Sequence, residues 1–117
     1  MKIAENEIKL TDKSIGELDG LDELYYKVSK EKTEAIYKAF SENPINPEGE
    51  PDDSYVEGDL QFHFDSESGE LQEILLLPVY DDGEGFADGD FISLDDDYFE
   101  DGVLEAVTDQ YNKLKAA

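Results

Sequence analysis

The amino-acid sequence predicts an α+β fold, a single domain in which helices cover one face of a small antiparallel sheet. Three observations lead to this fold class. Apolar and polar residues alternate over residues 59–65, turn-forming residues follow, and an apolar segment returns up to residue 80. Two other segments, at about 29–42 and about 97–115, carry apolar residues at helical spacing. The length of 117 residues suits one domain with one core.

The first strand is expected over residues 2–10, where apolar residues alternate weakly with polar ones. After it, the spacing of Ser14 and Glu17 fits a helix-capping box, in which each side chain bonds to the backbone of the other residue. Gly16 lies between them and Gly20 follows closely, so only a short helical turn is expected there.

Two interpretations compete for the segment that follows. One long helix would form an apolar stripe that continues at the charged Lys32, which argues against it. In a strand, alternate residues from Leu24 to Val28 share one face, and Ser29 then caps a helix over about 29–42. We prefer the strand followed by the helix. The inner side of this helix is expected to consist of Ala35, Ile36, Ala39 and Phe40.

A loop is expected at about residues 43–56, because Pro44, Pro47 and Pro51 interrupt both helix and strand. It is the one plausible domain boundary. It lies too near the middle of the chain to leave two viable cores, so residues 1–117 are predicted to form one acidic domain.

The clearest element is a hairpin at about 59–80. Its first strand turns Leu60, Phe62 and Phe64 inward, and a Ser-Glu-Ser-Gly turn follows. The second strand contains the continuous apolar run 74–77, which indicates burial on both faces over part of its length.

A short strand at 91–94 and a helix at about 97–115 complete the predicted fold. The three aspartates at 95–97 would complement the positive end of the helix dipole. Gly102 is the weak point of this helix, because glycine disfavours a helix interior. The buried stripe is expected to be Phe99, Val103, Ala106, Val107, Tyr111 and Leu114.

Charge is distributed very unevenly along the chain. The sequence holds 32 acidic residues against nine lysines, for a formal net charge of -23. Residues 39–112 contain 23 carboxylates and no lysine or arginine, whereas residues 1–38 are nearly balanced. An ordinary soluble surface mixes both signs, because like charges on a compact body repel. We therefore interpret the acidic block as a functional surface that meets a basic protein.

The composition excludes several classes of protein. Six Phe and seven Tyr, within 38% hydrophobic residues, are too many for a disordered acidic tail. The negative charge would repel nucleic acid and anionic membranes, so neither is expected as a direct partner. No apolar run approaches the roughly 18 residues of a membrane span, and no signal-peptide core is present, so a cytoplasmic location is expected. The absence of cysteine excludes disulfides and thiolate metal sites.

The chain is not expected to be an enzyme or to hold a cofactor. It has one histidine, no cysteine and no motif for an activated nucleophile. His63 falls on the outward face of the first hairpin strand and is interpreted as a surface histidine among carboxylates. A phosphate-binding loop at Gly83, Gly85 and Gly89 would need a nearby cation, but acidic residues surround these glycines.

A calcium-binding module is a weaker alternative. Calcium takes oxygen ligands from flexible loops, and the glycine-rich segment 81–90 offers several carboxylates. The spacing of an EF-hand is not met, because the third and fifth positions from Asp81 are Gly83 and Gly85. No specific metal site is predicted, although loose binding of divalent ions fits such a loop.

The dimensions of the acidic block fit an imitation of DNA. Duplex DNA carries about one charge per 1.7 Å of its axis, so 23 charges correspond to roughly 40 Å of duplex. Residues on one face of a strand recur about every 6.6 Å, which is close to two base-pair steps of about 3.4 Å each. Carboxylates at strand ends and on loops can therefore take the places of phosphates.

In length, charge and predicted α+β character, the chain resembles the small acidic bacterial DNA-mimic proteins, in particular the neisserial member that binds the histone-like protein HU. The resemblance extends over the whole chain and includes no short motif. It implies that the acidic surface occupies the DNA-binding face of an HU-like nucleoid protein and competes with DNA. The protein would then be a cytoplasmic monomer, associated with the nucleoid through its partner.

The carboxylates expected to contact the partner follow from the residue pattern alone. They lie before the hairpin, in the glycine-rich loop and at the start of the last helix: Asp52, Asp53, Glu57, Asp59, Asp81, Asp82, Glu84, Asp88, Asp90, Asp95, Asp96, Asp97, Glu100 and Asp101. The alternative function is an immunity or inhibitor protein that neutralises a basic toxin nuclease through a central aromatic anchor. The candidate anchors are Tyr55, Tyr80 and Tyr98.

Overall fold

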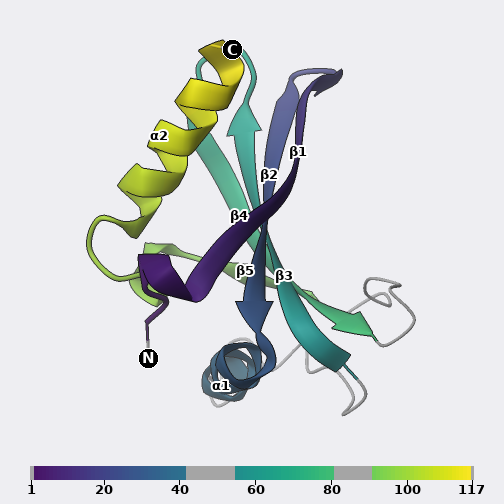
Figure 1. Cartoon of the computed structure of the whole chain (residues 1–117), viewed down its shortest axis with the longest axis vertical. Coiled ribbons are helices and arrows are strands. Elements are labelled where there is room, and N and C mark those ends of the chain that lie inside the picture. Colours follow the sequence, from purple (N-terminus) through teal and green to yellow (C-terminus); the bar gives the residue numbers. More distant parts are fainter. Residues whose placement is uncertain (1, 42–54, 81–90, 117) are drawn as a thin grey trace.

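A computed structural model describes residues 2–41, 55–80 and 91–116. Within these residues, one five-stranded antiparallel sheet has the strand order β1-β2-β3-β4-β5, and two helices pack on it (Figure 1). The predicted α+β class is therefore confirmed. The elements are η1 (Glu5–Glu7), β1 (Ile8–Leu18), β2 (Leu21–Ser29), α1 (Lys30–Ser41), β3 (Tyr55–Asp65), β4 (Leu71–Tyr80), β5 (Ile92–Leu94), η2 (Asp96–Tyr98) and α2 (Val103–Ala116).

The N-terminal strand begins later than predicted. Glu5–Glu7 form a short 3-10 turn, and Ile3 makes a single parallel bridge with Phe99. The strand predicted over residues 2–10 is confirmed only from Ile8 onward. The first residues pair with the C-terminal part of the chain, a long-range contact that no local pattern reveals.

The helical turn predicted around Ser14 is wrong, because these residues lie in β1. This strand stays paired with β2 as far as Leu18, with an irregularity after Ser14. Gly16 adopts φ +75° within the irregularity, and its N–H donates to Asp22 Oδ1 at 2.9 Å. Glycine allows this positive φ angle at the irregularity of the edge strand β1. Its backbone N–H donates its hydrogen bond to a side chain of β2.

β2 ends and α1 begins where the sequence predicted. The Ser29 hydroxyl accepts a hydrogen bond at 3.2 Å from an N–H in the first turn of α1, which confirms Ser29 as the helix cap. Ile36 and Tyr37 are buried, and the Tyr37 hydroxyl donates to the carbonyl of Leu76 at 3.0 Å. Ala39 is exposed rather than buried, because the contact with β4 is made by Tyr37 instead.

Some predicted features lie outside the residues that the structure describes. These are most of the proline-rich loop, the glycine-rich loop 81–90 and the side chains of Phe40 and Tyr55. Since β3 begins at Tyr55, the predicted loop to about residue 56 ends slightly too late.

β3 and β4 form the predicted hairpin. Leu60, Phe62 and Phe64 have no exposed surface and point toward the helices. In β4 the apolar run is buried on the helix side and at Leu77, whereas Leu75 is half-buried. The predicted burial of both faces of β4 therefore holds only in part.

The C-terminal helix begins at Val103, later than predicted. Asp95 caps the short η2 turn, because its Oδ1 accepts a hydrogen bond at 3.0 Å from the N–H two residues onward. The chain then extends, so that Phe99 packs on Phe62 with ring centroids 5.8 Å apart. Gly102 takes φ +89° directly before α2, a conformation that glycine adopts without strain. Gly102, predicted as the weak point inside a longer helix, instead directly precedes the first residue of α2.

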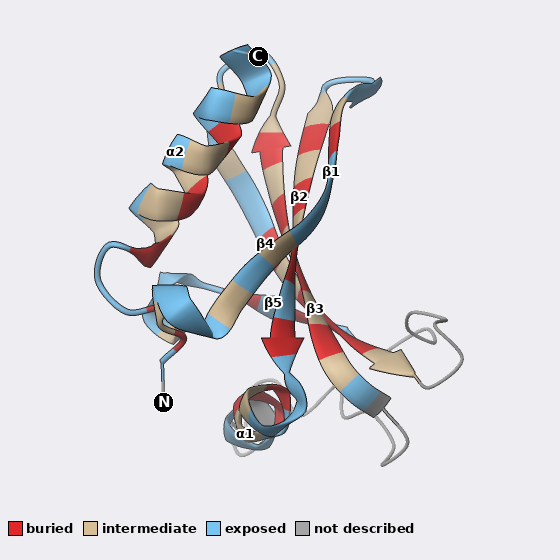
Figure 2. Cartoon of the chain, in the orientation of Figure 1, coloured by how far each residue is buried: buried red, intermediate tan, exposed pale blue. Residues whose placement is uncertain are grey.

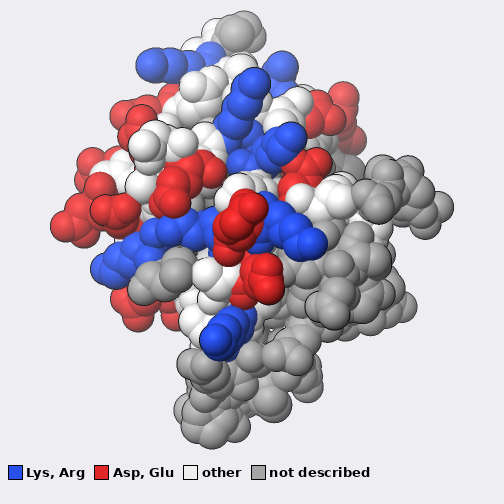
Figure 3. Space-filling model, turned by 60° about the horizontal axis from the view of Figure 1, so that its bottom comes forward, with Lys and Arg blue, Asp and Glu red and all other residues white. Residues whose placement is uncertain are grey.

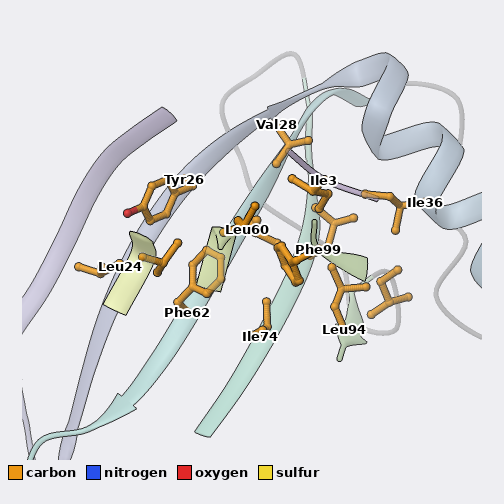
Figure 4. Packing of buried hydrophobic residues seen from close by; sticks show 14 of the residues in the cluster. Ile3, Leu24, Tyr26, Val28, Ile36, Leu60, Phe62, Ile74, Leu94 and Phe99 are labelled. Carbon is orange, nitrogen blue, oxygen red and sulfur yellow. The ribbon is translucent and has the colours of Figure 1, made fainter. Parts of the chain in front are cut away.

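The core lies on the side of the sheet that faces the helices (Figure 2). Figure 4 shows Leu60 and Phe62 of β3 beside residues of β2, with Phe99 close to them. At the C-terminal end of β3, Tyr111 of α2 stacks on Phe64 with ring centroids 4.1 Å apart. In β3, Glu57 and the alternate residues after it point the other way, to a sheet face that neither helix covers.

Asp22 is the one described carboxylate that is buried. Its Oδ2 accepts hydrogen bonds from the Tyr111 hydroxyl at 2.6 Å and the Lys115 ammonium at 2.7 Å. Burial raises the pKa of Asp22, but these bonds and that from Gly16 outweigh burial and hold the pKa below its usual value. The ionised Asp22 thus joins the C-terminal turns of α2 to β1 and β2.

Candidate protein-binding surface

The structure describes 22 of the 32 carboxylates. Seventeen of them are exposed and four are half-buried, in addition to buried Asp22. For these residues, the expectation that the chain folds and keeps its charge outside is confirmed. None of the helices in the described ranges is long and apolar enough to cross a membrane.

Half of the predicted partner-binding residues can be placed. Asp52, Asp53, Asp81, Asp82, Glu84, Asp88 and Asp90 lie outside the described residues. The residues that the structure places are Glu57, Asp59, Asp95, Asp96, Asp97, Glu100 and Asp101.

The placed residues fall on two different surfaces. Residues 95–101 run along the helix side of the sheet, since Phe99 in this segment packs on Phe62. Glu57 and Asp59 belong to the positions of β3 that point away from the helices. The structure therefore does not bring all predicted carboxylates onto one face.

The first group continues into α2. Glu105 and Asp109 are exposed and lie on successive turns, about 6 Å apart along the helix axis. Sequence analysis missed these two residues, although their four-residue spacing after Asp101 could have indicated them. We use the name acidic ridge for seven exposed carboxylates: Asp95, Asp96, Asp97, Glu100, Asp101, Glu105 and Asp109.

The acidic ridge is not neutralised by ion pairs with other described residues. The lysine ion pairs in the described ranges use carboxylates elsewhere, at Glu7, Asp22 and Glu57, and His63 lies against Glu23 and Glu73. Lys2 lines the same shallow depression as several ridge residues but takes part in none of these pairs. The ridge therefore keeps its charge available to another molecule.

Lysines gather at another end of the molecule. Lys30, Lys32 and Lys38 belong to α1, and Lys27 lies near the end of β2. Figure 3 shows this end, with lysine and carboxylate side chains interspersed. The uneven charge of the sequence thus becomes an uneven surface, mixed around α1 and mainly acidic along the ridge, where Lys2 lies beside the first carboxylates and Lys113 follows Asp109 by one helical turn.

Asp95, Asp96 and Asp97 each offer a carboxylate oxygen within 4.8 Å of the other two. All three are exposed, and Asp95 already caps the η2 turn. Such a group attracts cations loosely, as exposed carboxylates do. The loop predicted as the weaker calcium candidate lies outside the described residues.

A second polar group lies on the sheet face opposite the helices. The Tyr25 hydroxyl donates a short hydrogen bond to Glu23, and Glu23 Oε2 lies 3.0 Å from His63 Nε2. Gln61 joins this group, with its Oε1 at 3.2 Å from His63 Nε2 and its Nε2 donating to Asp59 Oδ2 at 3.1 Å. We name Glu23, Tyr25, Asp59, Gln61 and His63 the sheet-face network. His63 points outward among carboxylates, as predicted, but its side chain is only 13% exposed, so it is not the surface histidine expected from the sequence.

Two groups in the sheet-face network have shifted pKa values. Burial raises the pKa of Asp59, and the nearby carboxylates Glu57, Asp12 and Glu23 raise it further, against a hydrogen bond from Gln61. Burial and the hydrogen bond to Glu23 raise the pKa of Tyr25, so its hydroxyl stays protonated. The network therefore contains a carboxylate that lacks stabilising positive charge.

Comparison of the chain with protein-family models, curated proteins and solved structures found no match.

Proposed function

We propose that this protein binds the DNA-binding surface of a basic DNA-binding protein, of the HU-like nucleoid class, and competes there with DNA. The observation that supports this function best is the acidic ridge, seven exposed carboxylates without ion pairs to other described residues. A basic partner would contact them without first breaking ion pairs within this protein.

The geometry of the ridge is compatible with the imitation of a phosphate backbone. Carboxylates on successive turns of α2 lie about 6 Å apart along its axis, and two base-pair steps of DNA rise about 6.8 Å. The molecule measures 39 Å along its longest axis, comparable to the roughly 40 Å of duplex that carries as many charges as the acidic block.

The proposed mechanism is electrostatic. The field of the ridge steers the basic protein into contact, so association is fast and weakens steeply as salt rises. The protein acts as a monomer in the cytoplasm and reaches the nucleoid only through its partner. It needs no cofactor, and it does not contact DNA itself because both are negatively charged.

The alternative inhibitor of a toxin nuclease requires an aromatic side chain that projects into an active site. Two of the predicted anchors, Tyr80 and Tyr98, are half-buried, and Tyr98 packs against the core. Among the described Phe and Tyr residues, the exposed one is Phe91, at 42%, and this alternative would rest on it.

A competition experiment tests the proposed function. Purified HU-like protein binds a fluorescent DNA duplex, and increasing amounts of this protein should release the duplex. Four neutral substitutions on the ridge, Asp96→Asn, Asp97→Asn, Glu105→Gln and Asp109→Asn, should raise the concentration needed for half release about tenfold, a loss of about 1.4 kcal/mol.

The matched control removes the same charge from exposed positions off the ridge, with Asp19→Asn, Glu31→Gln, Glu34→Gln and Glu67→Gln. It should change the half-release concentration less than about threefold, roughly 0.7 kcal/mol. Equal losses in the two variants would mean that only net charge matters and that the ridge is not the contact. Failure of the unmodified protein to release any duplex would reject the imitation of DNA.

A further inference from the structure

The sheet face opposite the helices differs from the acidic ridge in its construction. It combines side chains from three neighbouring strands, β1, β2 and β3, whereas the ridge follows a single stretch of chain. In the strand register, Asp12 of β1 lies beside Tyr25 of β2, which lies beside Gln61 of β3. An aromatic ring thus stands in the middle of a polar sheet surface, with a carboxylate next to it.

Carboxylates outnumber the cations on this face. Lys27 stands directly opposite Asp59 in the register, but its ammonium pairs with Glu57 at 2.9 Å. Within the described ranges, Asp59 forms no ion pair and takes its hydrogen bond from the neutral amide of Gln61. Asp59 is therefore a half-buried carboxylate, and the lysine opposite it in the register is already paired with Glu57.

The surroundings of Asp59 favour the arrival of a positive group. Burial and the neighbouring carboxylates raise the pKa of Asp59, which means that the ionised form of this side chain is less stable here than in water. A cation placed between Asp59 and Asp12 would stabilise the ionised form of Asp59. Tyr25, half-buried, lies opposite Asp12 in the register and diagonally across from Asp59, which faces Lys27 two residues further along β2, and it adds an aromatic ring that attracts cations.

Arginine suits such a surface better than lysine. Its planar guanidinium donates to carboxylates in a fixed geometry and stacks on aromatic rings, whereas the lysine ammonium is compact and strongly hydrated. We propose that the sheet face is a second docking surface, on which Tyr25, Asp12 and Asp59 receive an arginine side chain of the basic partner. This inference rests on the proposed function for the identity of the partner.

The docking surface can be tested without the partner. The isotope-labelled full chain is titrated with a tri-arginine peptide and, separately, with a tri-lysine peptide, and backbone amide shifts are followed by NMR. The arginine peptide should shift the amides of Tyr25, Asp59 and Gln61 and bind about threefold more tightly than the lysine peptide, a difference in the range of one exposed cation–π contact.

Substitutions assign this preference to the proposed residues. Asp59→Asn and Tyr25→Leu should each abolish the difference between the two peptides, whereas Tyr25→Phe, which keeps the ring, should retain it. Asp19→Asn, in the turn between β1 and β2, is the matched control for lost charge and should leave the difference intact. Equal binding of both peptides, or shifts confined to the ridge, would overturn the inference.

The competition experiment separates this inference from the proposed function. Asp59→Asn should raise the half-release concentration about threefold beyond Asp19→Asn, which removes the same charge from a turn. If the ridge variant loses competition but Asp59→Asn does not, the sheet face does not receive the partner, and the proposed function stands. If the unmodified protein never releases DNA, the proposed function fails, and the peptide titration still decides whether the sheet face selects arginine.

Discussion

Asp22 and Asp59 show how the fold moves the pKa of one side-chain type in opposite directions. Both belong to the central strands of the sheet, on opposite faces. Asp22 is buried but receives hydrogen bonds from Tyr111, Lys115 and Gly16, so its pKa falls. Asp59 is only half-buried, but burial and the neighbouring carboxylates raise its pKa despite a hydrogen bond from Gln61. The charged form is favoured in the first residue and disfavoured in the second.

Asp22→Asn should destabilise the protein by about 1–3 kcal/mol, because buried donors lose their charged acceptor. A carboxylate with a lowered pKa in the folded state stabilises that state above its unfolded pKa. The contribution is lost as pH falls through the lowered folded pKa. In urea unfolding followed from neutral to acidic pH, the gap between the original protein and the variant should therefore shrink. A gap that widens on acidification would contradict the assignment.

Asp59→Asn should have the opposite effect and stabilise the protein by about 0.5 kcal/mol at neutral pH. A carboxylate with a raised pKa favours folding below its unfolded pKa, and this advantage is lost as pH rises through the folded pKa. The stabilisation by Asp59→Asn should thus appear above the folded pKa of Asp59 and disappear at acidic pH. The same unfolding series measures it, with Asp19→Asn as the control for an exposed carboxylate. A loss of stability at neutral pH would show that Asp59 already has a stabilising cation.

At the scale of elements, the junction between α1 and β3 depends on one glycine. A Cβ atom on Gly58 would lie 2.2 Å from Thr33 Oγ1, far inside van der Waals contact. Thr33 is itself fixed, because it is fully buried and its hydroxyl donates to the Ser29 carbonyl at 2.8 Å. The close approach lets the first turn of the helix pack directly on the strand.

Gly58→Ala should therefore destabilise the protein by about 1–3 kcal/mol through overpacking. Thr33→Ala removes the obstructing atoms, and the double variant should lose less than the sum of the two single losses. Thermal or urea unfolding of the four proteins gives this coupling. Additive losses would mean that the clash is relieved elsewhere.

Local patterns predicted the elements whose contacts are local. The alternation of Leu60, Phe62 and Phe64 predicted β3, and the side chain of Ser29 predicted the start of α1. The start of α2 could not be predicted in the same way, because it depends on Phe99 leaving the helix to pack on the core. Likewise, the capping pattern around residue 14 gave no sign that Gly16 bonds to Asp22 across the sheet.

The same distinction applies to the candidate surfaces. The acids at residues 95–101 are neighbours in sequence, so their grouping could be predicted without a structure. The sheet-face network could not, because Tyr25 meets Asp12 and Gln61 only through the register of three strands. A slip of one residue would turn these side chains to the other face.

At the scale of the whole molecule, a formal net charge of -23 opposes the compact state. Repulsion between carboxylates is weaker near α1, where lysines are interspersed with them (Figure 3), and stronger along the ridge, whose carboxylates form no ion pair with a described lysine. Screening acts over about 10 Å at 0.1 M salt and about 3 Å at 1 M. Ridge carboxylates on successive turns of α2, about 6 Å apart, are therefore screened mainly between these two concentrations.

Salt should thus stabilise the protein, raising the unfolding temperature by about 4 °C or more between 0.1 and 1 M NaCl, equivalent to about 1 kcal/mol. The four-residue ridge variant has less repulsion to screen, so it should start at a higher unfolding temperature and rise less with salt. The matched control variant, with two of its four substitutions among the lysines of α1, should resemble the original protein more closely. Circular dichroism melting curves over the salt series measure all three. Identical salt responses of the two variants would show that the ridge holds no special concentration of charge, and the surface proposed for the basic partner would lose its physical basis.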